Sequence, residues 1–216
     1  MHSFKLTHPD AQSLICRLGL QSKKVLGRGS FSAVFAHPDP ARDTVIKITN
    51  DKASYAYLDE GARCYGLDES RYFPKVIDYL ADINEELIDA DSDFRVVELE
   101  RLAKGRVSST ERRLLYAFAS RSFNALTPAP VTPEEQEWAA AQERKRPELC
   151  EELERFATRL ATFCADYHFR LDGLTGGNSM LRGDQLVFND PVFCEASMNA
   201  VRSKYAAARR QFNYFH

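Results

Sequence analysis

Short apolar runs separated by turn residues fill the first half of the chain, a pattern typical of β-strands. The runs lie at 24–26, 33–36, 44–48, 76–80 and 94–99. Between the third and fourth run, residues 53–66 carry apolar side chains at steps of three and four, which predicts a helix. This half therefore predicts a small sheet of about five strands with one helix.

The second half has the apolar spacing of helices. A start signal at Ser108 predicts a helix that runs through Phe118. The clearest helix begins at Pro147, because its apolar residues recur at steps of four and three as far as Phe163. Three prolines in 126–133 predict a loop ahead of it.

A hairpin and a basic segment complete the pattern. Residues 179–182 and 185–188 predict two short strands joined by Gly183-Asp184, so the Arg182-Gly183-Asp184 triplet is interpreted as a turn alone. From Ser197 we expect a basic helix interleaved with aromatic residues. A solvated basic face is favoured there, and a docking surface for an acidic partner or nucleic acid is the alternative.

Composition narrows the class of protein. The chain has 216 residues, of which 44% are hydrophobic and 28% charged, with a net charge of −2. These values exclude wholesale disorder and give no overall basic footprint for nucleic acid. No apolar run approaches the ~18–20 residues that cross a bilayer, and we expect no signal peptide. A cytoplasmic protein without a membrane segment is predicted.

Cysteine usage agrees with that location. The five cysteines are scattered, odd in number and never form a CxxC pair: Cys16, Cys64, Cys150, Cys164 and Cys194. Buried free thiols in a reducing compartment are favoured over disulfides or a metal site.

Two features of the predicted sheet suit phosphate binding. Gly27 and Gly29 lie in the first turn, where glycine lets the backbone approach phosphate oxygens; an ordinary turn is the alternative. A dinucleotide-binding βαβ unit is excluded because a strand follows. Lys47 lies within the apolar third strand, where its ammonium needs an anionic partner unless it reaches water at an edge. Together they predict a phosphate clamp.

The hairpin is flanked by two oxygen-bearing side chains. Asn178 precedes its first strand and Asp190 follows its second, so both lie at its open end. Amide and carboxylate oxygens suit Mg²⁺. Turn residues that cap the strand ends are the alternative.

Taken in order, these parts resemble the protein-kinase-like fold. The ordered set is a glycine turn, a strand lysine, a helix, a strand ending Val-Val-Glu-Leu-Glu-Arg-Leu, a long helix, an asparagine and Asp-Pro, over residues 24 to 193. The resemblance implies an α+β, two-lobed protein-kinase-like fold. It comprises a lead-in at 1–23, a small antiparallel-sheet N-lobe at 24–100 and a reduced helical C-lobe at 101–216.

A narrower resemblance rests on Gly-Arg-Gly-Ser-Phe-Ser-Ala-Val-Phe-Ala-His-Pro, Phe-Pro-Lys-Val-Ile-Asp-Tyr and Gly-Asn-x-Met…Asp-Pro-Val. These stretches are similar to the early serine/threonine kinases of short-tailed lytic bacteriophages. That family implies transfer of the ATP γ-phosphoryl group to host bacterial proteins in the host cytoplasm, with Mg²⁺, during shut-off of host transcription.

The resemblance also implies roles for residues. Contacts to ATP fall on Gly27, Arg28, Gly29, Ser30, Phe31, Val34, Lys47, Glu60, Leu99, Glu100 and Leu102. The resemblance implies that Asn178 and Asp190 bind Mg²⁺. Asp172 positions the acceptor hydroxyl and Lys47 holds the phosphates. Glu60 pairs with Lys47, and Asp59 is the competitor.

Departures from the family keep other functions open. The family places its catalytic aspartate five residues before the asparagine, whereas Asp172 lies six before Asn178 (178 − 172). Either glycines at 173, 176 and 177 absorb a bulge, which we favour, or the base is missing. Asp190-Pro191-Val192 replaces Asp-Phe-Gly, and 26 residues (216 − 190) leave no room for a full activation segment. A pseudokinase that binds a host factor and a small-molecule phosphotransferase are the alternatives.

Overall fold

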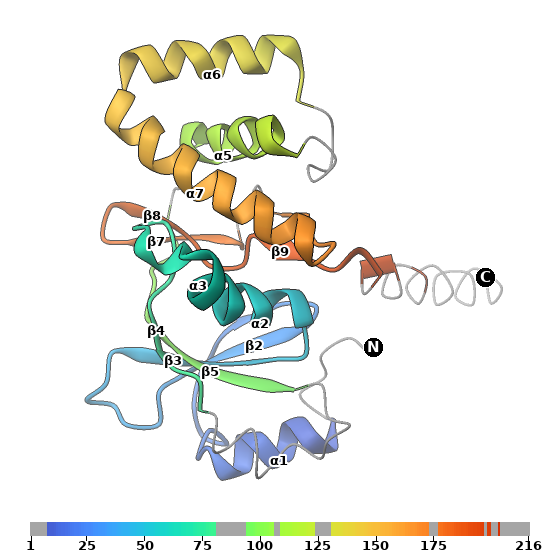
Figure 1. Cartoon of the computed structure of the whole chain (residues 1–216). Coiled ribbons are helices and arrows are strands. Elements are labelled where there is room, and N and C mark those ends of the chain that lie inside the picture. The colour runs from blue at the N-terminus through green and yellow to red at the C-terminus, as the bar shows by residue number, and fades with distance from the viewer. Residues whose placement is uncertain are drawn as a thin grey trace, which may run out of the picture.

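A computed structural model describes residues 8–80, 94–105, 109–123, 131–172, 177–196, 198–199 and 203. Its sheet lies on one side of the molecule and most of its helices on the other (Figure 1). The sheet is antiparallel and has the order β1-β2-β3-β5-β4. A helix follows the third strand, and a helical lobe with a hairpin follows the sheet. The predicted α+β arrangement, a small antiparallel sheet followed by a helical lobe, is confirmed.

The strands of the sheet lie close to their predicted positions: β1 (Val25–Arg28), β2 (Ser32–Ala36), β3 (Thr44–Thr49), β4 (Val76–Asp78) and β5 (Arg95–Glu100). The predicted helix at 53–66 is two helices instead. They are α2 (Lys52–Leu58) and α3 (Glu60–Tyr65), which meet at Asp59. A short 3₁₀ helix, η1 (Leu67–Glu69), follows the left-handed Gly66.

Both faces of the sheet are covered. Side chains alternate between the faces of a strand, so Ile46 and Ile48 of β3 pack with α1 (Pro9–Arg17), while Val45 belongs to the core shared with α2. This explains why Val45, Ile46 and Ile48 are all buried apolar residues. Lys47 is buried as well and shares the face of Val45.

The helical lobe consists of α5 (Ser109–Ser122), α6 (Pro133–Lys145) and α7 (Pro147–Asp166). Helices α5 and α7 agree with their predicted positions, but α6 was not predicted. Its N-terminus has a capping box, in which Thr132 Oγ1 accepts from the Glu135 amide at 3.3 Å and the Glu135 carboxylate accepts from the Thr132 amide at 3.0 Å. The predicted loop falls largely outside the described residues.

Two small sheets link the lobes. The predicted hairpin is confirmed as β7 (Ser179–Arg182) and β8 (Gln185–Phe188), which turn at Gly183 with φ of 64°. Strands β6 (Arg170–Leu171) and β9 (Val192–Phe193) also pair. The hairpin therefore lies between the last strand of the sheet and the helical lobe (Figure 1).

Three sequence expectations have a mixed outcome. All five cysteines are free; Cys150 and Cys164 are buried, whereas Cys16 and Cys64 are exposed, so the expected burial of every thiol was wrong. No described helix has the length and apolar character needed to cross a bilayer. The predicted basic helix from Ser197 lies mainly outside the described residues.

Candidate functional site

A cavity of about 390 Å³ lies between the sheet and the hairpin. Most of the predicted site residues line it: Gly27, Arg28, Gly29, Val34, Lys47, Leu99, Glu100, Leu102, Asn178 and Asp190. Ser30, Phe31, Glu60 and Asp172 are not part of its lining. One cavity thus collects predicted site residues that are up to 163 positions apart (190 − 27).

Apolar side chains form two sides of the cavity. Leu26, Val34 and Val45 come from the first three strands, and Met180 comes from β7. An apolar slot with a few convergent polar groups is the usual form of a small-molecule site.

The glycine turn is anchored by main-chain bonds. The Gly29 amide donates to the Ser32 carbonyl at 2.9 Å, and the Phe31 carbonyl accepts from the Asn50 amide at 2.9 Å. Phe31 is buried, so it fastens the turn to β3. A Cβ at Gly27 would meet nothing within 4 Å. Packing therefore does not require this glycine, and its bare backbone lines the cavity.

Lys47 is buried in the cavity wall, with 3% of its surface exposed. Its Nζ lies 3.3 Å from Asp190 Oδ2 and donates to Ser54 Oγ at 2.6 Å. A buried ammonium needs such an anionic partner. Lys47 is therefore held against Asp190 rather than reaching water at a sheet edge.

The predicted pairing of Glu60 with Lys47 is wrong. Glu60 begins α3, and its carboxylate is hydrogen-bonded to the Tyr167 hydroxyl. Asp59 does not replace it, because its carboxylate pairs with Arg63. The Asp51 cap starts α2 early, and this brings Ser54 to Lys47.

Asp51, which the sequence reasoning missed, is a buried acid whose charge interacts with Lys47 and Asp190 although it does not line the cavity. Its carboxylate caps α2 by accepting from the Ala53 amide at 3.0 Å. Burial, followed by the negative charge of Asp190, raises the pKa of Asp51 to about 6, against the opposing effect of Lys47. An acidic residue before an apolar helix was the available signal, and it indicated a cap only.

The open end of the hairpin has unused oxygen atoms. Asp190 Oδ1 and Asn189 Oδ1 are buried and have no hydrogen-bond partner in the part of the chain that the structure describes. Asn178 Nδ2 donates to the Asp172 carbonyl at 2.6 Å, a bond that does not use its amide oxygen. Buried carbonyl and carboxylate oxygens without partners fit a hard cation such as Mg²⁺.

The protein supplies few ligands of its own. No three His, Cys, Asp or Glu side chains among the described residues are grouped as a metal cage. Any cation at Asn178 and Asp190 would therefore need further oxygens from a bound anion or water, which is the usual coordination of Mg²⁺ with phosphates.

Asp172 lies beside this end of the hairpin. Its amide donates to the Pro191 carbonyl at 2.6 Å. Burial raises the pKa of the Asp172 carboxyl; a hydrogen bond from Asn178 opposes this, and the charge of Asp190 adds to it. Of the glycines predicted to absorb a bulge, those at 173 and 176 lie outside the described residues.

Comparison with known proteins finds a distant likeness among solved structures. No family model matches the sequence, and no curated protein matches it. A solved ternary complex of APH(2″)-IIa with streptomycin and ATP is similar at 12% identity and a TM-score of 0.30, over 88% of this chain and 73% of that chain. This likeness is too distant to assign the chain to a family.

Proposed function

We propose that the chain binds ATP with Mg²⁺ in this cavity and transfers the γ-phosphoryl group to a serine or threonine hydroxyl. One observation carries the proposal: a buried lysine 3.3 Å from an aspartate whose second oxygen has no described partner, under a glycine turn. Cation, anion and bare backbone together suit a triphosphate better than a neutral ligand.

Different lining residues bind different parts of the nucleotide. Leu26, Val34 and Met180 enclose the base, and the main chain of Leu102, which no described residue hydrogen-bonds, recognises its edge. Gly27 and Gly29 cover the phosphates, and Lys47 neutralises their charge, oriented by Ser54. Catalysis of this kind consists mainly of positioning and charge neutralisation.

Asn178 and Asp190 would hold Mg²⁺, which when bound neutralises charge on the phosphate oxygens. Asp172 has the role of orienting the acceptor hydroxyl and accepting its proton. Its raised pKa favours proton uptake, and the Asn178 bond to its carbonyl holds it next to the metal ligands.

The charges of the cavity bear on the acceptor. Its two lining acids are already paired, Glu100 with Arg182 and Asp190 with Lys47. Arg28 and Lys104 line the cavity without an ion pair to any described residue. A polycationic small molecule finds no unpaired acid among the lining residues, so the charges favour a hydroxyl on a protein over one on such a molecule.

A pseudokinase is the second candidate, because Asp172 does not line the cavity. In that case the chain binds a host factor and transfers no phosphate. Both candidates share nucleotide-site residues, so only transfer separates them.

The test is incubation with Mg²⁺ and γ-labelled ATP, alone and with bacterial lysate, beside Asp172→Asn and Asp184→Asn. Asp184 is an exposed acid at the other end of the same hairpin and serves as the matched control. Labelled protein that disappears only with Asp172→Asn supports the kinase. Absence of labelling by the intact chain contradicts it, and acceptance of a cationic small molecule in place of protein contradicts the acceptor class.

A further inference from the structure

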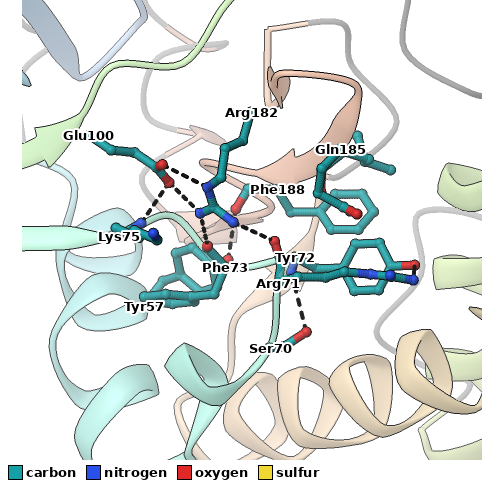
Figure 2. Close-up of polar contacts among 11 residues, drawn as sticks. Tyr57, Ser70, Arg71, Tyr72, Phe73, Lys75, Glu100, Arg182, Gln185 and Phe188 are labelled. Carbon is teal, nitrogen blue, oxygen red and sulfur yellow. Dashed lines mark hydrogen bonds and ion pairs between the residues drawn. The ribbon is translucent and has the colours of Figure 1, made fainter. Parts of the chain in front are cut away.

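The closed end of the β7–β8 hairpin is fastened to the strand that enters the cavity. Figure 2 shows the Arg182 guanidinium directed at the Glu100 carboxylate and at two main-chain carbonyls. Arg182 Nε donates to Glu100 Oε2 at 2.7 Å, and Nη2 donates to Glu100 Oε1. Nη1 donates to the Arg71 carbonyl at 3.0 Å and Nη2 to the Phe73 carbonyl at 2.9 Å.

Main-chain bonds extend this junction on both sides. The Lys75 amide donates to Glu100 Oε1 at 2.8 Å, and the Glu100 amide donates to the Lys75 carbonyl at 3.0 Å. Ala103 and Leu181 exchange two main-chain bonds of 2.8 and 2.9 Å. Residues 71–75, 100–103 and 181–182 therefore form one cross-braced unit.

The ion pair is partly withdrawn from water. The Glu100 side chain is 14% exposed and that of Arg182 is 27% exposed. Burial by itself raises the pKa of Glu100, but the bonds from Arg182 and the Lys75 amide outweigh it and lower that pKa. A partly buried pair with its remaining donors satisfied fixes geometry, because any other arrangement leaves a charge unpaired.

We propose that Arg182 is a positioning residue for the base end of the nucleotide cavity; this inference rests on the proposed function. Glu100, Arg101 and Leu102 are consecutive lining residues, and Met180 lies two residues before Arg182. By holding Glu100, Arg182 sets the position of Leu102 against Met180. The Glu100 side chain is consequently a structural anchor and not a nucleotide contact.

The chemistry requires arginine at this position. Its planar fork bonds a carboxylate bidentately and still reaches two carbonyls, which a lysine ammonium does not reproduce. The sequence interpretation of Arg182-Gly183-Asp184 as a turn alone was therefore incomplete.

The test compares Arg182→Lys and Arg182→Met with Arg121→Met. Arg121 is the matched control because it joins Glu143 and Glu154 far from the cavity. Two readouts are taken on folded protein: hydrogen exchange of residues 99–105 without nucleotide, and dissociation constants for ATP and tripolyphosphate with Mg²⁺. Tripolyphosphate has no base and serves as the probe of the phosphate end.

Both Arg182 variants are expected to speed exchange in 99–105 and to weaken ATP binding about tenfold, while tripolyphosphate binding changes less than about twofold. Arg121→Met changes neither. Unaltered exchange, or equal weakening of ATP and tripolyphosphate, overturns the inference. A third outcome separates the two proposals. If the Arg182 variants exchange faster but the unmutated chain binds neither ATP nor tripolyphosphate, Arg182 still fixes the position of residues 99–105, and the proposed function is contradicted.

Discussion

The two ends of the β7–β8 hairpin differ in how far their polar groups are hydrogen-bonded. At the closed end, Arg182 donates hydrogen bonds to Glu100 and to two main-chain carbonyls. At the open end, Asp190 and Asn189 each bury an oxygen that no described residue bonds. One hairpin thus has an end whose polar groups are hydrogen-bonded and an end with buried oxygens that no described residue bonds.

This difference indicates which end carries function. A buried polar group left unbonded costs ~1–3 kcal/mol, so folding alone does not favour it. A ligand that supplies the missing bonds makes such a group useful. The closed end therefore positions the hairpin, and the open end is where we expect the cation and phosphates to bind.

The largest expected effect is at the open end. Asp190→Asn is expected to lower phosphate transfer about 10³-fold, since a metal ligand supplies several kcal/mol of charge stabilisation. The free energy of unfolding should fall less in Asp190→Asn than in Arg182→Met, because Asp51 remains as a second carboxylate whose charge interacts with Lys47. Transfer assays and urea unfolding measure the two effects. Full transfer by Asp190→Asn would remove the metal assignment.

The next effect is at the closed end and concerns stability rather than phosphate transfer. Arg182→Met is expected to lower the free energy of unfolding by about 2 kcal/mol, since it leaves Glu100 and two carbonyls without their donor; partial exposure keeps the loss below that of a fully buried pair. Arg121→Met, at a more exposed network, should cost less than about 1 kcal/mol. Equal losses in the two variants would contradict the distinction.

A smaller effect on phosphate transfer is expected from Ser54, and almost none from Glu60. Ser54→Ala removes the 2.6 Å bond to Lys47 and is expected to lower transfer about tenfold, the value of one hydrogen bond to a charged group. Glu60→Gln should leave transfer within about twofold, because Glu60 bonds Tyr167 instead. Greater loss in Glu60→Gln would restore the helix glutamate as the partner of Lys47.

The smallest effect is a pH dependence at the closed end. The pKa of Glu100 is lowered from 4.5, so its stabilising contribution is complete above that value and is lost as pH falls through the lowered folded value. Glu100→Gln should lack this loss. Unfolding curves between about pH 3 and pH 7 test it, and parallel curves for the two proteins would count against the ion pair.

Much of the fold could be predicted because its signals are local. Short apolar runs between turn residues predicted the strands, and Gly183-Asp184 predicted the hairpin turn. Helix α6 was missed although its Thr132–Glu135 capping box is visible in the sequence, because few of its side chains are apolar and only Ala139 is fully buried. The break at Asp59 was missed because apolar spacing continues across it.

The site divides in the same way. Spacing predicted that the Gly27 turn lies near Lys47 and that Asn178 and Asp190 share the open end of the hairpin. The resemblance to a known fold joined the two pairs, and the cavity includes all four residues. Arg182 bonds Glu100 across 82 positions, and Ser54 bonds Lys47 across the turn from β3 to α2; no local pattern marks either partner. The pairing of polar side chains between elements is what the sequence alone did not reveal.

The central claim is that Asp190 completes a magnesium-dependent nucleotide site. Its most direct test is the thermal midpoint of the intact chain and of Asp190→Asn, each with ATP, in the presence and absence of Mg²⁺. The account predicts that Mg²⁺ enhances stabilisation by ATP in the intact chain and does not do so in Asp190→Asn. No stabilisation by ATP, or an equal Mg²⁺ enhancement in both proteins, would contradict it.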